Sequence, residues 1–314
     1  MSPFRVRPTI SLTGVNIRTS LTQVARGFAM GTADIVPGVS GGTVALVLGI
    51  YTTLIEQIHR GAGAIRSLLR RDLRAAREQL RSVEWVWLGS LLVGILAAIA
   101  ALSALIETLL TEQPVRTSSV FLGLVLGSVV VASKLVTSHR GRNASIAALT
   151  AIPLFLVLGL RADTHATGVE AVTRPWWVFV LSGALAICAM ILPGISGSFI
   201  LVMIGMYTEV IGAVNDRNIP ILAATGLGCV IGLMLFSSLL NWLLQHHHDT
   251  IIAAMIGLMI GSVRVLWPWP NGTWTTTISA PSGDVLMPIV LAVVAFAVVV
   301  VIDRLSTTTA SSGD

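Results

Sequence analysis

The sequence predicts an all-α polytopic membrane protein built from two inverted repeats, each a re-entrant helical hairpin followed by three transmembrane helices. Composition, the lengths of the apolar runs and a repeated Pro-Gly motif predict this fold. Of the 314 residues, 54% are hydrophobic and only 11% are charged, and the mean hydropathy is +0.85. Soluble domains carry about 25% charged residues, so we expect a membrane to be the solvent of this chain.

Six apolar runs are long enough to cross the hydrocarbon core, which takes about 20 helical residues. They are residues 85–110, 118–136, 144–160, 220–244, 251–267 and 285–302. Two further apolar stretches, 24–58 and 176–214, are interrupted near the middle by Pro and Gly. Each is too long for one span and too short for two, which is typical of a re-entrant hairpin that returns to the side it entered from.

The two interrupted stretches carry the same motif in the same order. Pro-Gly-Val-Ser-Gly at 37–41 recurs as Pro-Gly-Ile-Ser-Gly at 193–197. Further on, Gly-Ile-Tyr at 49–51 recurs as Gly-Met-Tyr at 205–207, and Gly-Leu-Val-Leu-Gly-Ser at 123–128 recurs as Gly-Leu-Met-Ile-Gly-Ser at 257–262. Matching landmarks of this kind indicate an internal duplication.

We therefore predict two repeats with short flanking segments. The parts are a cytosolic N-terminal segment 1–20, repeat 1 at 21–161 with a cytosolic Arg-rich loop at 60–84, repeat 2 at 175–302 and a cytosolic tail 303–314. A hairpin plus three crossings is an odd number of spans, so repeat 2 is expected to be upside down. On this path fifteen of the twenty Lys and Arg residues lie on the cytosolic side, as the positive-inside rule requires.

Each Pro-Gly break is followed by the start of a helix, whose free N–H groups favour an anion. We expect the two helix starts to meet near mid-membrane and to bind a phosphate there. The predicted phosphate-binding residues of the two breaks are Gly38, Ser40, Gly41, Gly42, Thr43, Gly194, Ser196, Gly197 and Ser198. The alternative is that Pro and Gly only kink the helices and that the small residues serve close packing.

Three charged residues are further candidates. Asp34 precedes the first break and has Met190 as its counterpart, so we expect a protonatable group that couples transport to protons, or else a cap for N–H groups of the break. Glu209 is a second candidate for proton coupling, unless it is a solvated helix end. Arg264 either completes the phosphate pocket or extends to the outer interface among tryptophans.

Other function classes fit less well. The breaks match the Gly-x-Ser-Gly pattern of intramembrane serine proteases, but every histidine is expected in a loop or at an interface, away from these serines. A passive anion channel stays open as an alternative. The cysteines, Cys188 and Cys229, lie in apolar runs, and the basic residues form no nucleic-acid-binding stripe. We expect no enzyme activity, catalytic residue, metal or cofactor, and no nucleic-acid partner.

The segment from Gly31 to Thr43, together with Gly49-Ile50-Tyr51, closely resembles the PopT family of polyprenyl-phosphate translocases. The resemblance continues through residues 189–198 and Gly261-Ser262 to Trp267-Pro268, and covers most of residues 20–302. It implies a bacterial plasma-membrane flippase that returns undecaprenyl phosphate from the outer to the inner leaflet for cell-envelope synthesis. The lipid substrate follows from the resemblance alone, and neither the resemblance nor the residue pattern indicates an oligomeric state.

Overall fold

The computed structural model describes residues 17–35, 39–138, 140–159 and 174–311. Within these residues all regular secondary structure is helical, with thirteen α-helices and one short 3₁₀ helix, η1 (Gly272–Trp274). Six of the helices are long and apolar enough to cross a membrane. The all-α, multi-pass class predicted from the sequence is therefore confirmed.

The six long helices match the six predicted spans to within a few residues, apart from a longer C-terminal end on the last. They are α5 (Trp85–Glu112), α6 (Pro114–Ser133), α7 (Arg140–Gly159), α11 (Ile219–His246), α12 (His248–Leu266) and α13 (Leu286–Ser311). Helices α5 and α11 each have 28 residues, about 42 Å at 1.5 Å per residue. This length exceeds the roughly 30 Å hydrocarbon core, so both helices can cross it at a tilt.

The two interrupted stretches each form three helices rather than two half-helices. The first contains α1 (Ile17–Asp34), α2 (Gly41–Val47) and α3 (Tyr51–Leu69), and the second contains α8 (Trp176–Ile191), α9 (Gly197–Met203) and α10 (Tyr207–Asn215). A second interruption follows each short helix, at Gly49 and Gly205, whose φ angles are +68° and +67°. The sequence predicted the Pro-Gly breaks but not these second turns.

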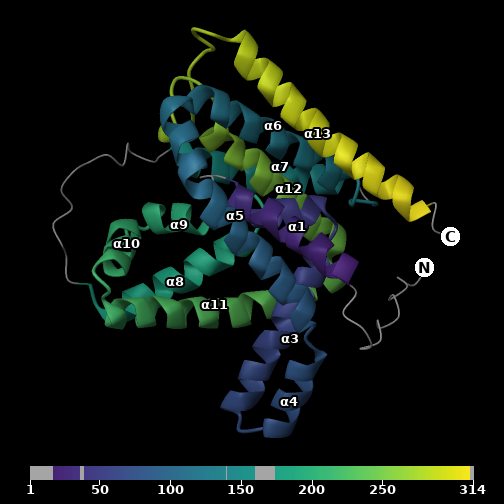
Figure 1. The fold of residues 1–314 in the computed structure, drawn as a ribbon, viewed down its shortest axis with the longest axis vertical. Helices are drawn as coiled ribbons and strands as arrows, with labels where there is room; N and C mark the ends of the chain where they lie inside the picture. The colour runs from purple at the N-terminus through teal and green to yellow at the C-terminus, as the bar shows by residue number, and fades with distance from the viewer. Residues whose placement is uncertain (1–16, 36–38, 139, 160–173, 312–314) are drawn as a thin grey trace.

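The Arg-rich segment 60–84 is helical, although we expected a loop. Helix α3 continues to Leu69, and α4 (Leu73–Ser82) folds back along it. Arg, Ala, Leu and Glu dominate the segment and are strong helix formers. Asp72 caps α4 by accepting a hydrogen bond from the Ala75 N–H at 3.0 Å. The α3–α4 hairpin projects from one end of the helix bundle (Figure 1).

Four helix pairs form the framework. Helix α1 packs along α5, and α8 packs along α11, so each half has one internal pair. Helix α13 packs along α6, and α7 packs along α12, so these two pairs join the halves. Figure 1 shows α13 lying over α6 at one edge of the bundle.

Glycines make the same close crossings in both halves. A Cβ on Gly27 of α1 would lie 2.0 Å from the Leu91 carbonyl oxygen, and a Cβ on Gly183 of α8 would lie 2.1 Å from the Thr225 carbonyl oxygen. The other crossings with this spacing join Gly94 to Val24, Gly228 to Val180, Gly123 to Ala292 and Gly257 to Ala147. Small residues at such positions let helix backbones touch. The repeated sequence therefore gives repeated packing.

Helix α2 and the start of α3 lie in the main apolar core, whereas α10 does not. Buried residues of α2 and the start of α3, including Leu46 and Tyr51, join this core with Val125 and Met259 of the long helices. Helices α8 and α10 share a separate cluster around Phe179, Met206 and Val210. The two interrupted stretches therefore pack differently.

Candidate functional site

The first break is organised by Asp34 and Ser40. Ser40 is the N-cap of α2, with extended backbone angles, and its hydroxyl accepts a hydrogen bond from the Gly42 N–H at 3.1 Å. Asp34, the last residue of α1, accepts the Gly41 N–H on Oδ1 at 2.6 Å. The first N–H groups of α2, which no helix carbonyl can reach, are thus satisfied by two side chains of the break. Asp34 does form the cap considered from the sequence, and its proton-coupling role stays a prediction.

The first break also binds the end of α8 from the other half. The Ser40 hydroxyl donates to the Met190 carbonyl at 3.2 Å, and the Tyr51 hydroxyl donates to the Ile191 carbonyl at 3.0 Å. Helix α8 ends at Ile191, and the last carbonyls of a helix have no partner within it. Two side chains of the first interrupted stretch, Ser40 and Tyr51, therefore satisfy carbonyls of the second.

Thr43 and Gly194 form a third link between the breaks. The Gly194 N–H donates to Thr43 Oγ1 at 3.1 Å in a buried position. Gly194 has a φ angle of +86°, and a Cβ there would lie 2.8 Å from the Met259 backbone. Only glycine combines this backbone angle with this close approach. The position of the second break thus depends on Gly194.

Residues of both breaks line one cavity of about 190 Å³. Its lining residues are Asp34, Ser40, Met190, Ile195, Ser196, Gly197 and Ser198. The Ser196 and Ser198 hydroxyls lie 2.8 Å apart. A single water needs only about 15 Å³ of such space, so the cavity can hold a larger polar group. Its lining offers three hydroxyls and one carboxyl group.

The remaining predicted residues of the breaks lie beside the cavity or outside the described part of the chain. Gly41, Gly42 and Thr43 are buried in the first turn of α2. Gly194 lines a smaller neighbouring pocket that also includes Ser196 and Ser262. Gly38 lies outside the described residues. The structure therefore gathers most of the predicted site around one space.

Arg264 and Glu209 do not line this cavity. The Arg264 guanidinium lies 4.9 Å from the Phe155 ring centre, and its Nε donates to the Thr276 carbonyl at 3.1 Å. Glu209 on α10 forms an ion pair with Arg174 at 2.9 Å. In this conformation both side chains have partners away from the breaks.

Sequence reasoning missed Tyr51 and the carbonyls at the end of α8. A signal was present in the sequence. The chain has two tyrosines, Tyr51 and Tyr207, and each is the last residue of the repeated Gly-x-Tyr motif. The partners could not be found from the pattern, since backbone carbonyls leave no trace in the sequence.

In the part of the chain that the structure describes, no three His, Cys, Asp or Glu side chains lie close enough to hold a metal ion. The residues that line the cavity include no histidine. His59 instead contacts Ser238, with 3.1 Å between Nδ1 and Oγ.

The fold and this cavity define a class of multi-pass helical membrane protein, in which two interrupted segments with the same Pro-Gly motif line a polar cavity. A family profile named VCA0040-like and described as undecaprenyl phosphate translocase-like matches residues 30–283. The chain belongs to this family, so the resemblance seen in the sequence motifs is confirmed.

Two relatives extend this comparison. A protein of Vibrio cholerae named polyprenyl-phosphate transporter is 41% identical over 251 residues, which cover 79% of this chain and 78% of the relative. A Staphylococcus aureus protein with the same name is 30% identical over 256 residues, which cover 78% of this chain and 85% of the relative. No solved structure matches the chain.

Proposed function

We propose that this protein is a flippase for a polyprenyl phosphate, with undecaprenyl phosphate returned from the outer to the inner leaflet of the bacterial plasma membrane. The observation that carries the proposal is the polar cavity lined by Asp34 and Ser40 from one half and by Ser196 and Ser198 from the other. The two relatives described above, from Vibrio cholerae and Staphylococcus aureus, are named polyprenyl-phosphate transporters. A phosphate head group needs such a cavity to pass an apolar bundle, whereas a polyprenyl tail can stay in lipid.

In the proposed complex, the hydroxyls of Ser196 and Ser198 donate hydrogen bonds to the phosphate, and the Ser40 hydroxyl donates to it after releasing the Met190 carbonyl. Asp34 lines the same cavity and is negatively charged when ionised. Two unit charges 4 Å apart interact by about 4 kcal/mol at an effective dielectric constant of 20. A phosphate therefore enters more easily when Asp34 is protonated, and this requirement couples a proton to the anion.

Two opposed repeats support a rocking mechanism. We assign repeat 1 to residues 21–161 and repeat 2 to residues 175–302, with both chain ends cytosolic. The equivalent pairs α1–α5 and α8–α11, and the exchanged pairs α6–α13 and α7–α12, support this assignment. Inverted repeats that place broken helices at their interface are a frequent design among transporters.

The conformation is asymmetric in a way that suits an outward-facing state. Helix α3 packs along α11, and the Arg66 guanidinium donates to Ser238 Oγ at 2.9 Å. On the proposed topology this contact closes the cytosolic side. The equivalent helices α10 and α5 show no comparable packing within the described residues. If α10 packed against α5 while α3 separated from α11, the cavity would open to the other leaflet.

A proteoliposome assay tests the proposal. We expect the reconstituted protein to move labelled undecaprenyl phosphate between leaflets, and we expect Ser40→Ala combined with Ser196→Ala to weaken binding of the phospholipid without unfolding the protein. Unchanged binding by the double variant would remove the cavity from the function. Inorganic anion current without lipid exchange would instead identify a channel, and peptide cleavage with labelling of a serine would identify a protease.

A further inference from the structure

The tip of the α3–α4 hairpin exposes both leucines and arginines. Leu68, Leu69 and Leu73 are 55%, 75% and 68% exposed. The arginines exposed around them are Arg70, Arg71 and Arg74. Large apolar side chains exposed together usually mark a surface that another phase or molecule covers. The arginines limit that phase or molecule to one with negative charge.

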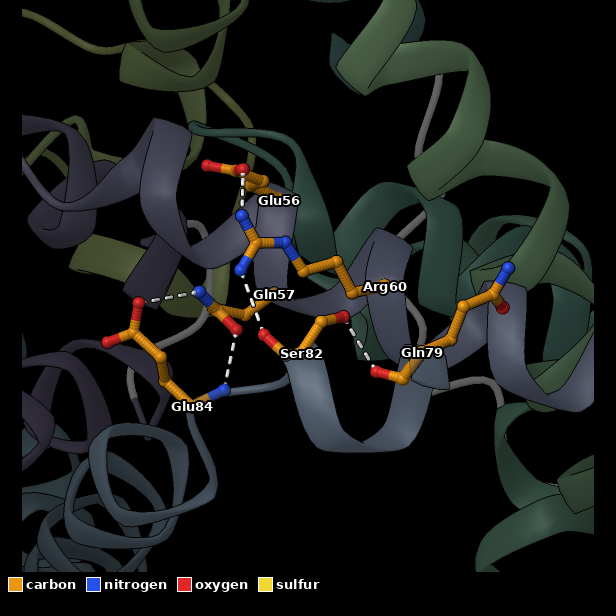
Figure 2. Close-up of polar contacts among 6 residues, drawn as sticks. All are labelled: Glu56, Gln57, Arg60, Gln79, Ser82 and Glu84. Atoms are coloured by element: carbon orange, nitrogen blue, oxygen red, sulfur yellow. Dashed lines mark hydrogen bonds and ion pairs between the residues drawn. The ribbon is translucent and has the colours of Figure 1, made fainter. Parts of the chain in front are cut away.

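The tip is held in place by its base, which Figure 2 shows. The Gln57 side chain accepts the Glu84 N–H at 2.9 Å and donates to the Glu84 carboxylate at 3.3 Å. Arg60 donates to the Ser82 carbonyl at 2.9 Å and also pairs with Glu56. These bonds tie the middle of α3 to the end of α4 and the start of α5. The exposed leucines therefore belong to a braced hairpin and not to a loose loop.

The turn itself keeps an arginine where glycine would fit the backbone better. Arg71 has a φ of +59°, in the left-handed region, which glycine adopts with less strain. Asp72 then caps α4. The backbone of the turn does not favour an arginine at position 71. The exposed guanidinium group of Arg71 is therefore the property that explains this residue.

The end of α4 lies beside a helix that is long and apolar enough to cross the membrane. Helix α4 ends beside α5, where the Trp85 indole N–H donates to the Leu80 carbonyl at 2.7 Å. Trp85 begins a membrane span and is 56% exposed, as is typical of a tryptophan at the lipid–water interface. The ten residues of α4 span about 15 Å. The nearest apolar phase for the three leucines is thus the bilayer that holds α5.

We infer that the α3–α4 tip is a peripheral anchor that binds the anionic lipid head groups of the cytosolic leaflet. Leu68, Leu69 and Leu73 enter the interface, while Arg70, Arg71 and Arg74 bind lipid phosphates. This combination of basic and apolar side chains is the usual basis of interfacial membrane binding. The inference depends on the proposed cytosolic position of the α3–α4 hairpin. Such an anchor would hold the C-terminal end of α3 at the membrane while α11 moves.

The test uses the full chain in nanodiscs. Leu69→Cys, in a background with Cys188→Ala and Cys229→Ala, carries a fluorophore that is quenched either by iodide in water or by a nitroxide on the lipid. With phosphatidylglycerol present, we expect quenching by the lipid nitroxide and protection from iodide. With phosphatidylcholine alone, we expect the reverse.

Charge variants test whether the arginines bind the anionic head groups. Arg70→Gln, Arg71→Gln and Arg74→Gln together should lower the equilibrium constant for docking by roughly a hundred-fold, at about a fivefold loss for each arginine near an anionic surface. The matched Arg→Lys triple variant keeps the charge and should stay docked. Equal iodide quenching in both lipid mixtures, or an unaffected Gln variant, would overturn the inference.

Two further outcomes have distinct meanings. If the fluorophore at Leu69→Cys is protected from iodide in native membranes but not in anionic nanodiscs, the tip binds a protein partner, and the inference of lipid binding is overturned. Failure of docking together with intact lipid exchange in proteoliposomes would overturn this inference alone. Labelling of Leu69→Cys from outside intact cells would overturn the proposed topology as well.

Discussion

The Tyr51 hydroxyl donates a hydrogen bond to the Ile191 carbonyl, and this contact joins the start of α3 to the end of α8. Tyr51 is 2% exposed, whereas its counterpart Tyr207 is 38% exposed. The residue equivalent to Ile191 in the first half is Ile35, which directly follows α1. If the two halves exchange arrangements as proposed, Tyr207 would donate to the Ile35 carbonyl and Tyr51 would be released.

We expect Tyr51→Phe to destabilise the observed state by about 1 kcal/mol, because a hydrogen bond between the halves is lost and a carbonyl loses its donor. The apparent Tm of the purified protein in detergent should fall by a few degrees. Tyr207→Phe is the matched control, and its Tm should hardly change since Tyr207 is exposed. Equal shifts for the two variants would contradict the idea that Tyr51, and not Tyr207, stabilises the observed state.

A side chain at Gly194 should move the second break. Gly194→Ala combines an unfavourable φ with a Cβ 2.8 Å from the Met259 backbone, and strained positions of this kind cost about 1–3 kcal/mol. We expect a lower Tm and a loss of lipid exchange. In Gly226→Ala the new Cβ would have no neighbour within 4 Å, so this helical control should keep both properties. A tolerated Gly194→Ala would show that the break can move freely.

The helices were predictable from the sequence because their signals are local. Twenty apolar residues in a row specify a membrane span whatever surrounds them, and the six spans were found with nearly correct ends. The α3–α4 hairpin was predicted as a loop because the many arginines were interpreted as charge alone. Their helix propensity and the Asp72 cap were the overlooked signals.

The site was predictable only in part. Pro-Gly motifs at two matching positions indicated where the helices break, and Asp34 was notable as a carboxyl group within an apolar stretch. The contacts between the breaks could not be predicted, since Ser40 and Tyr51 bond to backbone carbonyls whose positions depend on the tertiary fold. The position of the Arg264 side chain could not be predicted for the same reason, because its partner is the backbone carbonyl of Thr276.

Asp34→Asn should separate charge from structure. The asparagine oxygen can still accept the Gly41 N–H, so we expect the variant to fold, but it can no longer take up a proton. Lipid exchange in proteoliposomes should lose its dependence on a proton gradient. Glu209→Gln is the comparison, because Glu209 is paired with Arg174 away from the cavity. If only Glu209→Gln removes the dependence, the coupling role belongs to Glu209.

A reversible cross-link between α3 and α11 should stop transport, if rocking requires these helices to separate. His59 and Ser238 face each other across this contact. Their replacement by cysteines, in a background with Cys188→Ala and Cys229→Ala, allows a cleavable bifunctional reagent to join the halves. Lipid exchange should stop on cross-linking and return when the link is cleaved.

The control for this experiment joins two helices of the same half. A Cβ on Gly63 of α3 would lie 2.7 Å from the Gln79 side chain on α4, so Gly63→Cys with Gln79→Cys can be linked without crossing between repeats. We expect this protein to transport at its unlinked rate. Full transport by the linked His59→Cys and Ser238→Cys protein would mean that α3 and α11 move as one body, and the conformational change would then have to occur within the second hairpin.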